Sequence, residues 1–283
     1  MVKKKQIVVI VSVVVLMGLL LSLNIKGLVK DDEAGVAAGE ASSAAQTSSA
    51  IVTLQTVSDA AKQSLAVNLA EDITRLEEEV KQTSGAEKVK LQKTLAQKWD
   101  DVNQPAPGAF YYMEVSKAEG GFKNWLKTGD LFTEAYQNST DSLAQPVFIH
   151  NATDAYKKAV ELDPKNLDAK AGLGIAYVNG SANPMEGIQL LLEVVKQEPK
   201  HIKANMNLGL FSIKSGQFDK AVDRFKTVTQ AEPNPEAWFY LASCYETLGM
   251  KGDAIAAYEK SKELAADPGL SQYVDRKVEE LRK

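Results

Sequence analysis

The sequence predicts an all-α protein in which helical hairpins stack on one another along a solenoid. The main observation is a residue pattern that recurs with a shift of 33 positions near the C-terminus. A repeat period of this size predicts stacked pairs of helices. A second observation is Glu232-Pro233, which ends one unit because proline cannot continue a helix. A third is a closing segment with apolar residues on one side and charges on the other, which is typical of a capping helix.

The repeat is clearest between residues 202 and 267. A large apolar residue beside a small one marks the first helix, glycine marks a turn, and a small residue four positions before an aromatic one marks the second helix. The corresponding residues in the two copies are Leu208-Gly209 and Leu241-Ala242, Gly216 and Gly249, Ala221 and Ala254, and Phe225 and Tyr258. Small residues let two helices approach closely, so each copy predicts one tightly packed hairpin.

This pattern resembles the tetratricopeptide repeat, a 34-residue unit with Trp, Leu, Gly and Tyr on its first helix and Ala, Phe and a terminal Pro on its second. In the last unit, the residues that fall on those positions are Trp238, Leu241, Ala242, Tyr245, Gly249, Ala254 and Tyr258. The resemblance implies a right-handed solenoid of about four to five such units. It also implies a role in binding other proteins.

The chain begins with a basic N-terminus, residues 1–5, that carries three lysines. Residues 7–25 are almost uninterrupted Val, Ile and Leu, and at ~1.5 Å per residue they match the roughly 30 Å hydrocarbon core of a bilayer. We therefore expect a transmembrane anchor at residues 6–26, in preference to a cleaved signal peptide, whose apolar region is shorter. The lysines favour a single-pass protein with a cytoplasmic N-terminus and repeats on the export side, the periplasm in a bacterium with two membranes.

Residues 27–50 form the predicted linker, because residues 31–50 are mostly Ala, Ser and Gly, a composition typical of disorder. Within residues 51–88 we expect one long helix, from about residue 53 to residue 82. Its apolar stripe consists of Leu65, Leu69, Ile73, Leu76 and Val80. The stripe suits packing on the first repeat, which we favour, or a coiled coil that makes a homo-oligomer through residues 53–82.

The predicted repeat units then follow one another. They are a degenerate unit at 89–121, a unit with an inserted loop at 122–166, and regular units at 167–201, 202–234 and 235–267. The unit at 122–166 carries about eleven extra residues, which we place in a loop between its helices near 137–151. Residues 268–283 form the predicted capping helix, since stacked repeats need a polar-faced end.

Composition argues against several classes of function. The formal net charge is −4, with the lysines at the N-terminus included, so we expect no nucleic-acid partner. Cys244 is the single cysteine, which excludes an internal disulfide and a cysteine-based metal cage. His150 and His201 have no second ligand at metal-binding spacing, and we interpret both as surface loop residues. We therefore expect no catalytic residue, metal or cofactor, and a protein that is not an enzyme.

The resemblance implies a partner-binding groove lined by residues of the first helix of each unit. Carried onto this chain, the family's offsets select Ile175, Met206, Asn207, Leu210, Ile213, Phe239, Tyr240, Ser243 and Glu246. Family members that bind C-terminal carboxylates use Lys, Asn and Arg at such positions, and only Asn207 matches here. The groove is instead apolar and aromatic, which suits an extended or helical protein segment with hydrophobic anchors.

These features predict a membrane-anchored scaffold that holds protein or peptide segments and contacts the membrane through residues 6–26. Its layout resembles bacterial inner-membrane repeat proteins that assist the secretion channel or cytochrome c assembly, so an accessory subunit of such a complex is one alternative. A self-assembling structural protein is a second alternative. An accessory domain of a hydrolase complex and an outer-mitochondrial-membrane receptor with cytosolic repeats are two more.

Overall fold

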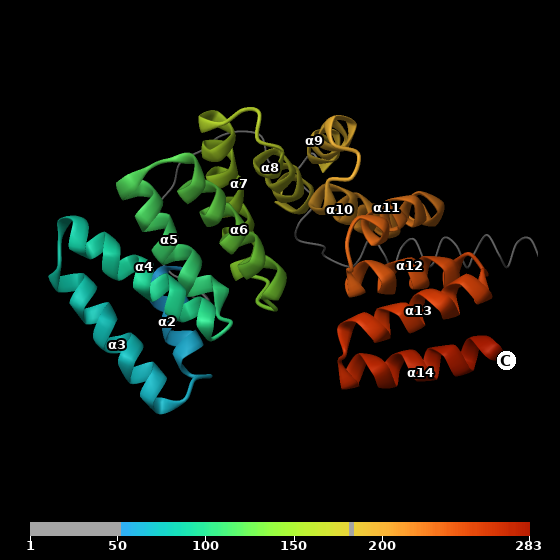
Figure 1. Ribbon diagram of the computed structural model, residues 1–283. Helices are drawn as coiled ribbons and strands as arrows, with labels where there is room; N and C mark the ends of the chain where they lie inside the picture. The colour runs from blue at the N-terminus through green and yellow to red at the C-terminus, as the bar shows by residue number, and fades with distance from the viewer. Residues whose placement is uncertain (1–51, 181–183) are drawn as a thin grey trace, which may run out of the picture. The chain divides into compact units, whose positions relative to one another are not determined.

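The computed structural model describes residues 52–180 and 184–283, which belong to one compact unit. These residues contain thirteen helices and no strand (Figure 1). The helices are α2 (Leu54–Lys62), α3 (Val67–Gln82), α4 (Gly85–Asp101), α5 (Pro105–Glu119), α6 (Phe122–Asn138), α7 (Ala144–Leu162), α8 (Leu167–Gly180), α9 (Pro184–Gln197), α10 (Ile202–Lys214), α11 (Phe218–Ala231), α12 (Pro235–Thr247), α13 (Lys251–Ala265) and α14 (Pro268–Arg282). The all-α prediction is confirmed for this part of the chain.

From α4 onwards the helices pack in consecutive pairs. The pairs are α4 with α5, α6 with α7, α8 with α9, α10 with α11, and α12 with α13. The second helix of each pair packs on the first helix of the next, and first helices also touch, α6 with α8, α8 with α10 and α10 with α12. The described residues therefore form a solenoid of stacked helical hairpins. Each pair lies within one predicted unit, except that α4 begins at Gly85, before residue 89.

Glycine makes the turns inside the last two pairs. Gly216 has a φ of +72° and Gly249 a φ of +74°, in the left-handed region that residues with a Cβ rarely adopt. The backbone N–H of Gln217 donates to the Ser212 carbonyl at 2.8 Å, and that of Met250 donates to the Tyr245 carbonyl at 2.9 Å. Each of these bonds joins an N–H to the carbonyl five residues earlier, and it ends α10 and α12 in the same way. The glycine turns predicted from the repeat pattern are thus present at both positions.

Close approach of helices depends on small residues, as the repeat pattern indicates. A Cβ built on Gly209 of α10 would meet the ring of Phe225 at 2.7 Å. Phe225 lies on α11, is fully buried and belongs to the core cluster formed by α10 to α14. The aromatic ring fills the space that the glycine leaves, which explains why the two residue types recur together.

The predicted single helix over residues 53–82 is wrong, because α2 ends at Lys62 and α3 begins at Val67. In the turn between them, the Ser64 hydroxyl donates to the Ala61 carbonyl at 2.8 Å. The turn lets α2 pack on α5 while α3 packs on α4. The stripe of α3 is buried at Ile73 and Val80 but exposed at Leu69, so α3 packs within the chain.

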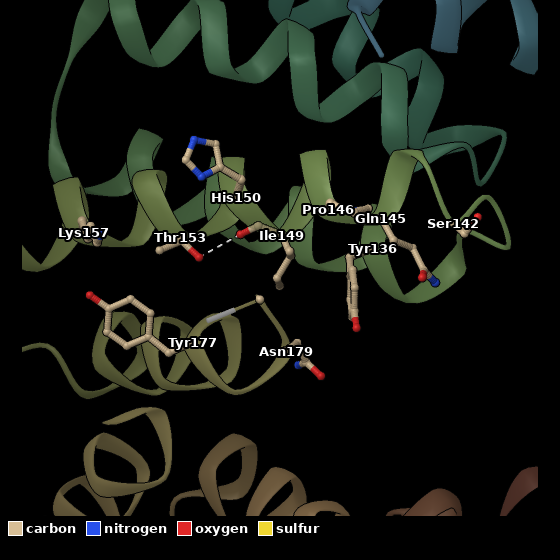
Figure 2. A pocket seen from close by; sticks show the side chains of 11 residues that line it. Tyr136, Ser142, Gln145, Pro146, Ile149, His150, Thr153, Lys157, Tyr177 and Asn179 are labelled. Atoms are coloured by element: carbon tan, nitrogen blue, oxygen red, sulfur yellow. Dashed lines mark hydrogen bonds between the residues drawn. The ribbon is translucent and has the colours of Figure 1, made fainter. Parts of the chain in front are cut away.

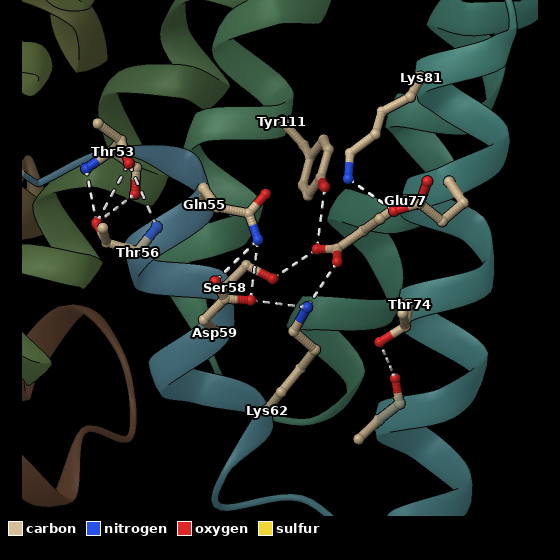
Figure 3. A network of polar contacts seen from close by, with 12 residues as sticks. Thr53, Gln55, Thr56, Ser58, Asp59, Lys62, Thr74, Glu77, Lys81 and Tyr111 are labelled. Atoms are coloured by element: carbon tan, nitrogen blue, oxygen red, sulfur yellow. Dashed lines mark hydrogen bonds and ion pairs between the residues drawn. The ribbon is translucent and has the colours of Figure 1, made fainter.

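A buried carboxylate joins α2 and α3 to α5. Glu77 of α3 accepts hydrogen bonds from the Ser58 hydroxyl, from Lys62 Nζ at 2.8 Å and from the Tyr111 hydroxyl at 3.1 Å (Figure 3). Its side chain is only 8% exposed, and Lys62 also pairs with Asp59 at 3.1 Å. Both carboxylate oxygens are therefore satisfied, as a buried charge requires.

The predicted inserted loop near residues 137–151 is also wrong. Helix α6 runs to Asn138 and α7 begins at Ala144, so most of the extra residues lengthen the helices. Phe148 and Ile149 are buried in the core cluster of α5 to α8, which they reach only from the first turns of a longer α7. His150 consequently lies on α7.

The predicted localisation is corrected. None of the helices within residues 52–180 and 184–283 is long and apolar enough to cross a membrane. The predicted basic N-terminus at 1–5, anchor at 6–26 and linker at 27–50 lie outside the described residues. A single-pass membrane protein with export-side repeats therefore has no support in the structure.

Helix α14 follows the last pair and packs on α13. It buries Val274 and Val278, while Asp275, Arg276 and Glu279 are exposed. Asp267 begins the helix by accepting a hydrogen bond from the Leu270 N–H at 2.6 Å. The helix thus has one apolar and one charged face, the arrangement predicted for the capping helix.

Candidate protein-binding face

Seven of the nine predicted groove residues lie half-buried on two helices that contact each other, α10 and α12. We call this set the α10–α12 face. It consists of Asn207, Leu210, Ile213, Phe239, Tyr240, Ser243 and Glu246. Leu210 and Ile213 pack partly on the core cluster of α10 to α14 and leave the rest of their surface accessible.

Tyr240 is the aromatic residue of this face with the most defined surroundings. Its ring stacks on Phe225, with 5.5 Å between ring centroids and 21° between the planes. Burial raises the pKa of the Tyr240 hydroxyl, and the nearby Glu236 carboxylate raises it further. Burial also raises the pKa of Glu236, while its hydrogen bond with Tyr240 acts in the opposite direction. Tyr240 is therefore a neutral, well-oriented side chain with one ring face against the core.

Phe239 contributes mainly to packing between helices rather than to the exposed surface. Its ring lies 5.7 Å from the ring of Tyr258 on α13 and 5.7 Å from the ring of Tyr273 on α14, measured between centroids. The contact with Tyr258 is edge-on, at 69°. Phe239 therefore links the last hairpin to α14, and only part of it is available to a partner.

The polar residues of the face are mostly engaged within the chain. The Asn207 amide donates to the Lys203 carbonyl of its own helix at 2.9 Å. Glu246 accepts from the Tyr258 hydroxyl and from Lys277 Nζ, each at 2.8 Å. Burial raises the pKa of Glu246, but the hydrogen bonds from Lys277 and Tyr258 outweigh it and leave the pKa below its ordinary value. Apolar and aromatic surface therefore dominates what the face offers.

The remaining two predicted groove residues are buried. Ile175 of α8 is only 2% exposed and packs in a separate core cluster with Ala171, Leu191 and Val194. Met206 of α10 is 9% exposed and belongs to the core cluster of α10 to α14, on which Leu210 and Tyr240 also pack. The structure thus places seven of the predicted residues on two contacting helices, and it places Ile175 and Met206 in the core.

The histidines differ from the surface-loop interpretation. His201 is buried at the start of α10, where Nδ1 accepts from the Ala204 N–H at 3.3 Å and Nε2 lies 3.3 Å from Asp168. His150 is exposed on α7, with Nε2 3.4 Å from Asp154. His201 therefore has a structural role as the N-terminal cap of α10.

A polar cluster that the sequence does not predict joins two hairpins, α6–α7 and α10–α11. Lys203 of α10 pairs with Asp130 of α6 at 2.7 Å, and the Tyr156 hydroxyl of α7 donates to the same carboxylate at 2.8 Å. A sequence separation of 73 residues between the lysine and the aspartate gives no local signal. Lys203, Met206 and Asn207 also line an open cavity of about 820 Å³ at the starts of α8 and α10.

A second surface cavity, of about 590 Å³, lies between α7 and α8 near the end of α6 (Figure 2). Its lining is polar and aromatic, with Tyr136, His150 and Tyr177 among the labelled side chains. Lys157 Nζ lies 5.7 Å from the centre of the Tyr177 ring, a cation–π arrangement. Among the described residues, no group of three or more His, Cys, Asp and Glu is placed to bind a metal.

The helix pairing defines the protein as an α-helical solenoid. Residues 213–271, which cover α11 to the start of α14, match the model of the tetratricopeptide repeat family. This match and the stacked hairpins support the prediction that the units are tetratricopeptide repeats.

Comparison with known proteins finds sequence similarity over a little less than half of the chain. It is 22% identical over 132 residues to the mitochondrial import receptor subunit TOM70 of Rattus norvegicus and to that of Mus musculus. The aligned part is 46% of this chain and 22% of each receptor, so the chain spans about a fifth of the length of these relatives.

Similar solved structures include MamA, at 21% identity with a TM-score of 0.44, covering 60% of this chain and 94% of that one. The type IV pilus biogenesis factor PilW has 18% identity and a TM-score of 0.48, with coverage of 65% and 80%. YrrB, described as a tetratricopeptide protein with an unusual peptide-binding site, has 17% identity and a TM-score of 0.42, with coverage of 72% and 97%.

Proposed function

We propose that the protein is a protein–protein interaction scaffold that binds a segment of a partner protein on the α10–α12 face. The observation that carries this proposal is a row of half-buried apolar and aromatic side chains on two contacting helices: Leu210, Ile213, Phe239 and Tyr240. Their inner sides are held by the core, so their outer sides present pre-oriented apolar surface. Binding to such anchors loses little conformational entropy, which is why aromatic residues dominate many interfaces.

The charges of this face favour a segment with hydrophobic anchors over a free carboxylate terminus. Glu236 and Glu246 lie on α12, and Lys277 is already paired with Glu246. The Asn207 amide is bonded to its own helix. A partner carboxylate would therefore meet acidic neighbours and no free cation among these residues, whereas Leu, Ile or aromatic side chains would find apolar surface.

Binding, with no catalytic step of its own, is the role we propose for the chain. The similarity to an import receptor subunit supports a binding role. Cys244, the single cysteine, is fully buried, and burial raises the pKa of its thiol to about 11. A thiol in that environment is protonated at neutral pH and a poor nucleophile.

The proposal is tested with Leu210→Glu and Tyr240→Glu in the full chain. Both residues are half-exposed, so we expect unchanged helical circular dichroism, a melting temperature within about 5 °C of wild type, and a loss of partner co-purification of at least about tenfold. Ala256→Glu, at an exposed position of α13, is the matched control and should co-purify the partner normally. If both variants of the face unfold, these side chains are core residues and the proposed face is wrong.

A further inference from the structure

Helix α9 has a wider apolar surface than its place in the solenoid uses. It buries Gly187, Leu191 and Val194 against the neighbouring helices. Beside this buried face, Met185 and Leu192 stay 56% and 43% exposed, with half-buried Ile188 between them. The exposed positions of α11 and α13, which are also second helices of their pairs, are mostly charged. A second apolar stripe on one helix indicates a surface that something else covers.

The packing around α9 leaves this stripe open to solvent. Helix α9 packs less extensively on α10 than α7 does on α8 or α11 does on α12. The result is a groove of about 450 Å³, within the size range of ligand-binding clefts. Met185, Ile188 and Leu192 form one wall, and Leu208 and Phe211 of α10 form its apolar floor. We call this the α9–α11 groove.

The opposite wall belongs to α11 and is positively charged. It is lined by Lys220, Asp223 and Arg224. Lys220 Nζ donates to the Gln217 amide oxygen at 2.6 Å, and the Arg224 guanidinium donates to the Asn205 amide oxygen at 3.1 Å. Neither cation forms an ion pair within the described residues, and neither does Asp223, so the wall has two positive charges and one negative charge.

The α9–α11 groove is separate from the α10–α12 face. Leu208 and Phe211 project from one side of α10, whereas Leu210 and Ile213 are offset from them by roughly half a turn at ~100° per residue. A ligand in the groove would therefore lie across the second helices of two hairpins. A ligand on the α10–α12 face would contact the first helices.

We propose that the α9–α11 groove binds an amphipathic α-helix of a partner protein, with its apolar stripe on α9 and α10 and acidic residues beside that stripe facing α11. The groove offers apolar positions at Met185, Ile188 and Leu192, a spacing that the ridge of a second helix can fill. Carboxylates at the flank of the bound helix would pair with Lys220 and Arg224. A basic flank would be repelled by the same two residues.

The test uses two synthetic amphipathic peptides of about 18 residues with the same leucine stripe, one flanked by Glu and one by Lys. Fluorescence anisotropy with the full chain should show saturable binding of the Glu-flanked peptide and at least about tenfold weaker binding of the Lys-flanked one. Leu192→Glu should weaken binding of the Glu-flanked peptide by a further tenfold or so, because a carboxylate then occupies the apolar wall. The double variant Lys220→Glu, Arg224→Glu should reverse the charge preference.

Two controls separate this site from the proposed face and from misfolding. Tyr240→Glu changes only the α10–α12 face and should leave peptide binding unchanged. If Leu192→Glu lowers the melting temperature, Met185→Glu repeats the test at a more exposed position of the same groove. Equal binding of both peptides, or no saturable binding of either, contradicts the proposal. So does self-association of the chain in sedimentation that is lost in Leu192→Glu, because the occupant would then be a second copy.

Discussion

At the scale of single residues, Tyr156 shows how one side chain determines the spacing of three helices. Its ring, on α7, is fully buried and faces Gly129 of α6 and Gly172 of α8. Its hydroxyl donates to Asp130 at 2.8 Å and lies 3.2 Å from the Thr133 hydroxyl. Burial raises the pKa of Tyr156 well above its ordinary value, and the Asp130 charge raises it further. The ring therefore has no room to swing aside, and its hydroxyl stays protonated at neutral pH.

Gly172→Ala tests this packing. A Cβ at Gly172 would overlap the Tyr156 ring, whereas a Cβ at Gly252 of α13 would meet nothing within 4 Å. We expect Gly172→Ala to lower the free energy of unfolding by about 1–3 kcal/mol, and Gly252→Ala to raise it by about 0.5 kcal/mol through the unfolded state. Urea denaturation of the two variants measures both effects. Equal stabilities would show that the Tyr156 ring is free to move.

Cys244 gives a second prediction at this scale. Because the thiol is buried and its pKa is raised to about 11, its reaction with a disulfide reagent at pH 8 should be on the order of 100-fold slower in the native protein than in guanidinium chloride. Stopped-flow labelling in both conditions measures the ratio. Rapid labelling of the native protein would contradict the burial of this residue.

The amino-acid sequence predicts small residues at helix crossings better than it predicts burial in turns. The Leu208-Gly209 pair is recognisable because its partner, Phe225, recurs at a fixed offset in the same unit. The burial of His201 depends on Asp168 in the preceding hairpin, and no local pattern reports that contact. The histidine therefore looked like an ordinary loop residue.

At the scale of elements, the attachment of α2 and α3 depends on Glu77. Glu77→Ala removes the shared acceptor of Ser58, Lys62 and Tyr111 and leaves Lys62 with only the exposed Asp59. We expect a loss of about 3 kcal/mol, seen as faster amide hydrogen exchange in α2 and a lower urea midpoint.

The control for this prediction is Glu78→Ala. Glu78 is 55% exposed and, within residues 52–180 and 184–283, pairs only with Lys81, one turn along α3, so its removal should cost less than about 0.5 kcal/mol. Similar exchange rates of α2 in the two variants would show that the Glu77 network does not hold α2 in place.

The two element-scale errors have one physical origin. Residues 63–66 contain neither glycine nor proline, so the apolar stripe of 53–82 looked continuous, yet packing on α5 and α4 divides it into two helices. The extra residues of 122–166 looked like a loop, yet Phe148 and Ile149 extend α7. Tertiary packing determines where the helices of both segments begin and end. The glycine turns of the later hairpins follow from local sequence and can be predicted.

At the scale of the whole described unit, α14 is bound to the last hairpin through Glu246 and Lys277, a link between α12 and α14. The folded-state pKa of Glu246 is depressed, so its contribution to stability is complete above the unfolded pKa of about 4.3. This contribution is lost as pH falls through the lower pKa that Glu246 has in the folded protein.

Glu246→Gln should therefore be less stable than wild type at pH 7. The difference between the two proteins should shrink as pH falls from about 5 towards 3, because wild type then protonates Glu246. Thermal melts across this range measure it. A difference that does not change with pH would mean that the Glu246–Lys277 pair contributes no charge interaction.

The solenoid could be predicted at this scale because each repeat encodes the same hairpin, and the candidate site could be predicted only in part. Family offsets brought Leu210 and Tyr240 to one face, but they also selected Ile175, which the structure buries in the core. The α9–α11 groove arises from the incomplete packing of α9 on α10, and no repeat offset encodes that departure.

We propose above all that the α10–α12 face binds another protein. Its most direct test is in-cell photocrosslinking from a reactive amino acid at position 240, followed by mass spectrometry of the attached protein. We expect capture of one discrete partner, lost in Leu210→Glu and retained in Ala256→Glu. Capture of only the chain's own copies, or capture that persists in Leu210→Glu, would contradict it.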